Sequence, residues 1–144
     1  MTQQVPLEIR RHQLVSRVRE AIQDQDIVVG VSGGGDSIAL LLLCVAASMQ
    51  QSSSFTVIVG HIHHGLRDES DDELLRVEDI CKRFGVKCIT KKIAVQSKNG
   101  SLAAGARDAR YEALCSIANE HHISTIAVAH HADDQLETML MALC

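Results

Sequence analysis

The sequence predicts an α/β fold, namely an open and mostly parallel sheet with helices on both faces. Four short, mostly apolar runs alternate along the chain with longer stretches in which apolar residues recur at helical spacing. Three of these runs are β-branched and nearly continuous, which is typical of parallel strands covered on both faces. Strands that alternate with helices favour a parallel sheet joined by right-handed crossovers.

The four predicted strands are bounded by polar or glycine-containing segments. Their sequences are IVVGV, TVIVGHI, KCITKKI and TIAVAH, at residues 27–31, 56–62, 87–93 and 125–130. In such sheets, ligands bind at the carboxyl ends of the strands. A strand order of 3-2-1-4 would make the ends of the first and fourth strands neighbours at that edge.

Helical patterns precede and separate the strands. Residues 71–84 place four apolar side chains on one stripe, and Gly85 follows as the predicted C′ residue. Residues 101–120 begin with Ser101, the predicted N-cap, and have a continuous apolar face. Further helices are predicted through residue 22, from near Asp36 and from Asp133.

Length and composition indicate one domain at residues 26–144, preceded by a lead-in helix within residues 1–25. The formal net charge of −4 gives this segment no electrostatic footprint for nucleic acid. The longest apolar run, residues 38–47, is too short to span a bilayer, and the N-terminus lacks a signal-peptide core. The five cysteines form no CxxC pair, and their odd number at core-like positions suggests reduced thiols. We therefore expect a cytoplasmic protein without a membrane partner.

The segment SGGGDS separates the first strand from the next helix. Glycines let backbone N–H groups approach an anion, and the positive end of the helix faces the same place. Asp36 is unnecessary for a turn, but it is expected if Mg²⁺ bridges it to phosphate. The alternative is a glycine-rich turn without a ligand; neither a Walker A loop nor GxGxxG is matched. The predicted phosphate-binding residues are Ser32, Gly33, Gly34, Gly35, Asp36 and Ser37.

Three histidines gather at the end of the second strand, namely His61, His63 and His64. Histidines this close together could ligate a metal, line a nucleotide base pocket or belong to a solvated loop. The residues alone leave all three interpretations open, and the nucleotide pocket is favoured.

Two further segments carry charged residues. Arg107 and Arg110 are three residues apart, so they share one side of a helix and suit a phosphate group, although the residues alone favour two solvated arginines. HHADDQLET follows the fourth strand, with His130 at the strand end. Asp133 and Asp134 open the expected helix there, where two acids can equally serve as N-terminal caps.

SGGGDS resembles the SGGxDS loop of the N-type ATP pyrophosphatases. In order, the four segments SGGGDS, HIHHGLR, ARDARY and AHHADDQLET resemble motifs of the tRNA(Ile)-lysidine synthetase family. The resemblance covers nearly the whole chain from residue 27 to residue 144. It implies an adenine nucleotide alpha hydrolase-like fold, here with its fifth strand missing.

The resemblance also implies an ATP-dependent ligase acting on the wobble cytidine, C34, of the isoleucine tRNA with a CAU anticodon. ATP adenylylates the oxygen at C2 of that base and releases pyrophosphate, and the ε-amine of free L-lysine then displaces AMP. Asp36 and Asp134 would hold Mg²⁺, Arg110 would stabilise the transition state, and His61 would border the adenine. The weaker candidates that it implies are Arg107, His130 and Glu137.

The family continues beyond this region with a further strand and C-terminal tRNA-binding domains, whereas this sequence ends at MLMALC. We therefore expect an incomplete domain, inactive alone, whose fourth strand has an open edge that favours a homodimer. The relatives that thiolate tRNA carry lysine at the position of Gly35 and a CxxC pair, and this chain has neither. The alternatives are a tRNA thiolase of the same fold, a di-metal hydrolase built from HIHH and HHADD, and a non-catalytic nucleotide-binding module.

Overall fold

The computed structural model describes residues 4–50, 55–63, 69–93, 102–132 and 135–142. Its five strands form one sheet in the order β3-β2-β1-β4-β5. The first four pair in parallel, so the predicted order 3-2-1-4 is confirmed. The strands are β1 (Ile27–Gly30), β2 (Val57–His63), β3 (Lys87–Lys92), β4 (Thr125–Ala132) and β5 (Gln135–Ala142).

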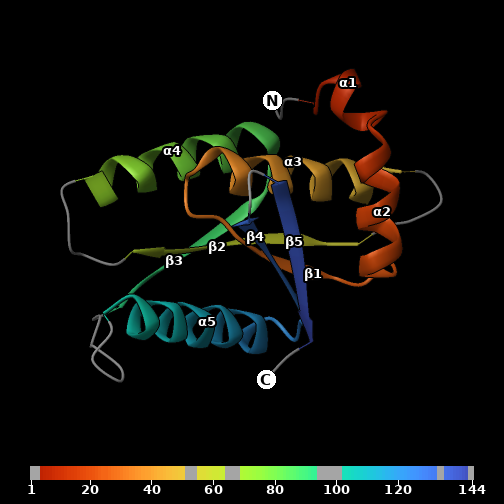
Figure 1. Ribbon diagram of the computed structural model, residues 1–144. Helices are drawn as coiled ribbons and strands as arrows, with labels where there is room; N and C mark the ends of the chain where they lie inside the picture. Colours follow the sequence, from red (N-terminus) through yellow and green to blue (C-terminus); the bar gives the residue numbers. More distant parts are fainter. Residues whose placement is uncertain (1–3, 51–54, 64–68, 94–101, 133–134, 143–144) are drawn as a thin grey trace.

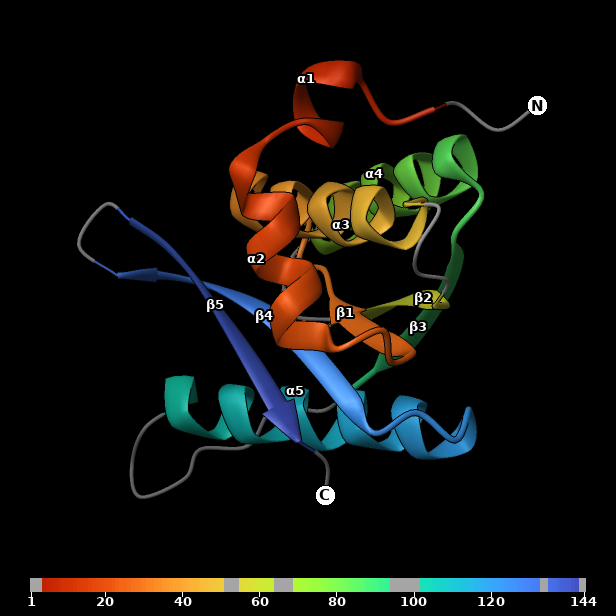
Figure 2. The same ribbon diagram turned by 90° about the vertical axis from the view of Figure 1, so that its right-hand side faces the viewer.

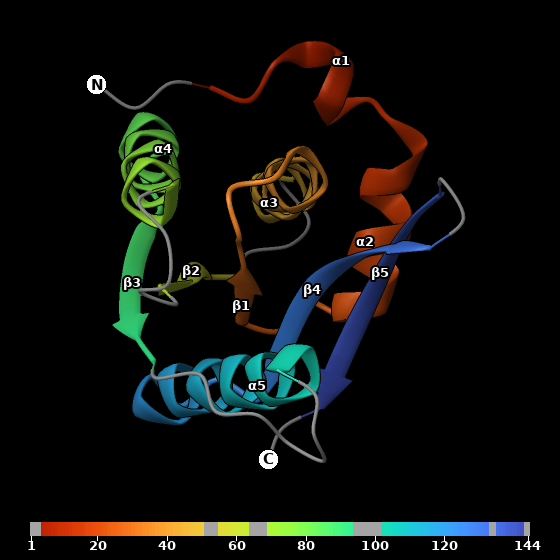
Figure 3. The same cartoon turned by 60° about the vertical axis from the view of Figure 1, so that its left-hand side comes forward.

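Helices cover both faces of the sheet, as predicted (Figures 1 and 3). One face is covered by α3 (Gly35–Ser48) and α4 (Glu69–Phe84), with α1 (Leu7–Arg10) and α2 (Gln13–Ile22) packed beside α3. The other face is covered by α5 (Leu102–Glu120). Each parallel crossover therefore returns through a helix, which explains why the inner strands are apolar on both sides.

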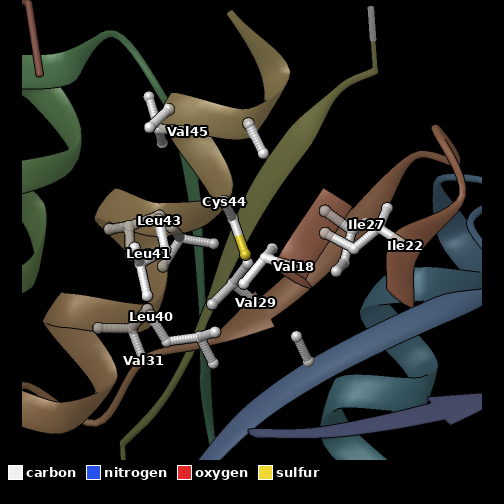
Figure 4. Close-up of a cluster of buried hydrophobic side chains, with 14 of the residues drawn as sticks. Val18, Ile22, Ile27, Val29, Val31, Leu40, Leu41, Leu43, Cys44 and Val45 are labelled. Carbon is white, nitrogen blue, oxygen red and sulfur yellow. The ribbon is translucent and has the colours of Figure 1, made fainter. Parts of the chain in front are cut away.

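The larger core cluster lies between α2, α3 and the sheet (Figure 4). Val29 of β1 and Cys44 of α3 are fully buried in it, and Val18 of α2 is a buried member of the same cluster. The lead-in region therefore shares the core of the main domain. It forms two helices rather than one, because the His12 side chain accepts a hydrogen bond from the Leu14 amide and starts α2. The division of the chain at residue 25 stays a prediction.

The smaller cluster packs α5 against the opposite face of the sheet, and Gly60 of β2 makes this close approach possible. A Cβ atom at Gly60 would lie 2.7 Å from Cδ2 of Leu114 and 3.2 Å from Cδ1 of Ile117. Both side chains are fully buried.

We expect Gly60→Ala to lower the free energy of unfolding by about 1–3 kcal/mol, because α5 must shift or its side chains must leave their rotamers. Urea denaturation of both proteins would measure this change. Gly35→Ala is the matched control, since a Cβ atom there would meet nothing within 4 Å. An unchanged urea midpoint for Gly60→Ala would contradict the tight packing.

The helix predicted from Asp133 is wrong. Residues 135–142 form β5, which pairs antiparallel with β4, from Ala132 opposite Gln135 to Thr125 opposite Ala142 (Figure 2). An open β4 edge would present unpaired N–H and C=O groups, and strand pairing satisfies them. The premise for the homodimer was this open edge, which β5 covers; the homodimer itself stays a prediction.

The structure also bears on the expectations about membrane-spanning segments and cysteines. No helix within the described ranges is long and apolar enough to cross a membrane. Cys44, Cys81 and Cys88 carry free thiols, as expected. Cys115 is disulfide-bonded, contrary to the expectation of reduced thiols, since an odd number of cysteines does not prevent two of them from pairing.

Candidate functional site

The glycine-rich loop (residues 32–37) lies at the carboxyl end of β1 and runs into α3. Gly33 has a φ of +99°, a conformation that side chains disfavour, so glycine is required there. The first amides of α3 have no carbonyl partner inside the helix, and the positive end of the helix dipole faces the loop. This placement gives the loop the features of an anion-binding turn. That it binds phosphate stays a prediction.

Residues of strand β2 contact Val31, which directly precedes the loop. The Val31 amide donates to the Gly60 carbonyl at 3.0 Å, and Nδ1 of His61 lies 2.7 Å from the Val31 carbonyl oxygen. Because a carbonyl oxygen can only accept, Nδ1 of His61 must carry the proton. His61 is only 2% exposed, so it supports the loop from within the protein. Its predicted place beside adenine stays a prediction.

The two serine hydroxyls of the loop hold it in one shape. The Ser37 hydroxyl donates to the Gly34 carbonyl at 2.9 Å and accepts from the Ser32 amide at 3.2 Å. Its only hydrogen is thereby used, so in the 3.2 Å contact between the two hydroxyls Ser32 is the donor. With both hydroxyl hydrogens engaged inside the loop, the donors left to face an anion are backbone amides.

Open space lies over the two glycines that lead into α3. A Cβ atom at Gly34 would approach only Oγ of Ser32, at 3.6 Å, and one at Gly35 would meet nothing within 4 Å. Protein packing therefore does not require glycine at these positions. Asp36 follows in the first turn of α3, and its side chain is exposed. The loop thus offers bare backbone, free space and a carboxylate side by side.

We expect Gly35→Ala to separate stability from ligand binding. The free energy of unfolding should rise by up to about 1 kcal/mol, because alanine has less conformational freedom than glycine in the unfolded chain and favours a helix. ATP should bind about tenfold more weakly, a loss of about 1.4 kcal/mol, because the methyl group keeps phosphate from the backbone. Thermal unfolding and calorimetric titration with ATP would measure the two effects. Unchanged ATP affinity would show that this space is not used.

The histidine cluster does not form a metal centre in the part of the chain that is described. His63 is 5% exposed, and its Nε2 lies 2.8 Å from Oδ1 of Asp71 on α4. Among the described residues, its buried Nδ1 has no hydrogen-bond partner. His64 lies outside the described residues. Within them, no three histidine, cysteine or acidic side chains are grouped to hold a metal ion.

Helix α5 brings its two arginines to the same edge of the sheet as the loop. The helix connects the carboxyl end of β3 to the amino end of β4, so its N-terminal half lies at the carboxyl edge. Leu114 packs beside Gly30 at the end of β1, and Arg110 lies about 6 Å further along the axis toward that edge. Arg110 is half-buried and burial lowers the pKa of its guanidinium, whereas Arg107 is exposed.

The structure describes only some of the remaining predicted site residues. Asp134 lies outside the described residues. The β4–β5 register sets His130 opposite Glu137, so the backbones of these two weaker candidates are neighbours.

Sequence reasoning missed the wall that α4 forms beside the loop. Glu73 lies beside Gly33, where an added Cβ atom would be 3.4 Å from Cβ of Glu73. Nη1 of Arg76 donates to the Gly33 carbonyl at 3.3 Å. Neither Glu73 nor Arg76 belongs to the four sequence motifs, and only their three-residue spacing could have suggested a shared contact.

Comparison with known proteins gives consistent results. Residues 5–144 match the sequence family described as the PP-loop domain. The chain is 43% identical over 122 residues to tRNA(Ile)-lysidine synthase of Bacillus cereus (strain ATCC 10987 / NRS 248), covering 81% of this chain and 25% of that protein. It is 35% identical over 138 residues to the Proteus mirabilis (strain HI4320) enzyme of the same name, and the match covers 95% of this chain and 31% of that protein. The chain thus spans about a quarter to a third of the length of these relatives.

A solved structure shows the same fold. The U34-tRNA thiolase NcsA from Methanococcus maripaludis, solved with its [4Fe-4S] cluster, superposes with a TM-score of 0.71 at 16% identity. The match covers 89% of this chain and 48% of the thiolase. At this identity the likeness concerns the fold alone.

Proposed function

This chain belongs to the family of PP-loop domains, and from that premise we propose that it is the ATP-binding domain of a tRNA(Ile)-lysidine synthetase. The observation that carries ATP binding is the glycine-rich loop, with open space over Gly34 and Gly35 at the amino end of α3. The choice of reaction is supported by the similarity to enzymes named tRNA(Ile)-lysidine synthase.

The proposed reaction has two steps. The C2 oxygen of cytidine 34 attacks the α-phosphorus of ATP, an O–P bond forms, and pyrophosphate leaves. The ε-amine of free lysine then attacks C2, the C2–O bond breaks, AMP leaves with the oxygen, and the amine loses a proton. Adenylylation is needed because the bare base oxygen is a poor leaving group.

The residues have distinct proposed roles. Backbone amides of the glycine-rich loop bind the departing pyrophosphate, and Arg110 stabilises the negative charge that develops at the α-phosphate. Asp36, in the glycine-rich loop, has an exposed carboxylate whose oxygens suit Mg²⁺, and Asp134 is the second proposed ligand. When bound, Mg²⁺ would neutralise phosphate charge. Of the weaker candidates, Arg107 is proposed to contact phosphate, and His130 and Glu137 are proposed to position the activated base or lysine.

The decisive experiment uses a full-length protein that contains this chain. We expect pyrophosphate release only when ATP, lysine and isoleucine tRNA with a CAU anticodon are all present, with lysine incorporated into the tRNA. Incorporation of sulfur instead would support the thiolase. Stoichiometric zinc without ATP binding would support the di-metal hydrolase, and ATP binding without pyrophosphate release would support a binding module.

A further inference from the structure

Helix α4 forms a wall beside the glycine-rich loop through two residues one turn apart, Glu73 and Arg76. Glu73 lies beside Gly33, and its Cβ and Cγ would be 3.4 and 3.6 Å from a Cβ atom added at Gly33. Arg76 reaches the same residue with its guanidinium, 3.3 Å from Nη1 to the Gly33 carbonyl oxygen. Residues three apart share one helix face, so a single face of α4 supports the loop.

The contact from Arg76 orients one peptide group of the loop. The Gly33 carbonyl and the Gly34 N–H belong to the same planar trans peptide, in which they point in opposite directions. Drawing the carbonyl toward α4 therefore turns the Gly34 N–H away from α4. That amide now makes only a long contact, 3.4 Å, with Oγ of Ser32. Glycine at position 33 resists peptide rotation weakly, so an outside contact is needed to hold this orientation.

Arg76 also brings a positive charge to the loop. A guanidinium keeps its charge at every physiological pH and has five N–H donors, of which the Gly33 contact uses one. Within the described residues Arg76 makes no ion pair, whereas Arg83 on the same helix pairs with Asp79 at 2.8 Å. The chain has a net charge of −4 and Asp36 is exposed at the loop, so a positive group here offsets repulsion of a phosphate ligand.

We propose that Arg76 is a positioning residue of the phosphate site, which orients the Gly33–Gly34 peptide and adds positive potential for the pyrophosphate half of ATP. This inference rests on the proposed function, because it assumes that the loop binds ATP. It assigns α4 a part in nucleotide binding through a residue outside the four sequence motifs.

The test compares Arg76→Met with Arg83→Met by calorimetric titration of the chain with inorganic pyrophosphate and with ATP, both with Mg²⁺. Both variants keep an aliphatic stem and remove one charge from α4, but Arg83 lies two turns further along the helix, about 10 Å away. Arg76→Met should weaken pyrophosphate binding about tenfold, as expected for loss of a charge-assisted contact. Arg83→Met should leave it unchanged.

Two further measurements separate positioning from general stability. Arg76→Lys keeps the charge and can still donate a hydrogen bond, so it should stay within about threefold of the wild-type affinity. In ¹⁵N-resolved spectra of the ligand-free chain, the amide signal of Gly34 should move in Arg76→Met and stay in place in Arg83→Met. Should Arg76→Met fail to fold, Arg76→Gln replaces it and should also weaken pyrophosphate binding.

The outcomes distinguish this inference from the function on which it rests. If the wild-type chain binds neither ATP nor pyrophosphate, the proposed function fails, and the role of Arg76 fails with it. If the wild type binds both and Arg76→Met binds equally well, only the inference is overturned. Equal weakening by Arg83→Met would also overturn it, because the effect would then come from the charge of α4 as a whole.

Discussion

Asp36→Ala is expected to lower Mg²⁺-dependent pyrophosphate release by about a hundredfold or more, as for loss of one strong electrostatic contact at a phosphoryl centre. The fold should be almost unaffected, because the Asp36 side chain is exposed. An acidic group in the first turn of a helix contributes less than about 1 kcal/mol. Pyrophosphate release by the full-length protein and thermal unfolding of the same variant would measure the two effects.

Two variants control for charge and shape. Asp36→Asn keeps the size of the side chain and loses the charge, so it should be nearly as inactive as Asp36→Ala. Asp72→Ala removes an exposed carboxylate from α4 and should retain normal activity. Near wild-type release by Asp36→Ala would refute the proposed role in holding Mg²⁺.

Arg110→Lys should slow adenylylation by about a hundredfold, the effect of losing about 3 kcal/mol of charge stabilisation. Lysine keeps the positive charge but loses the planar fork that can contact two phosphate oxygens. Arg110 is half-buried, where water compensates poorly for a lost contact, so the effect should exceed that at an exposed position.

Single-turnover rates and ATP affinity of the full-length protein would check this prediction. The rate should fall more than the affinity if the contact forms mainly in the transition state. Arg107→Lys is the control on the same side of α5, and its exposed side chain should make it far milder. Equal losses in rate and affinity for Arg110→Lys would instead indicate a ground-state contact.

The fold class and the position of the glycine-rich loop could be predicted from the sequence because both depend on local patterns. Continuous β-branched runs such as residues 27–31 can be buried on both faces only in a sheet covered by helices, and helical spacing of apolar residues supplies those helices. SGGGDS lies between such a strand and such a helix, so its place at the carboxyl edge follows from chain order. The roles of Asp36 and Arg110 remain predictions.

The tertiary structure alone decided which distant residues support the loop and which segment pairs with the outer edge of β4. His61 contacts the Val31 carbonyl, 30 residues away in the sequence, and Arg76 contacts the Gly33 carbonyl, 43 residues away. Sequence periodicity carries no information about contacts over such separations. The segment QLETMLMA fits a helix or a strand by its own pattern. It forms β5 because the unpaired backbone groups along β4 are satisfied by a neighbouring strand, and that requirement exists only once the sheet has formed.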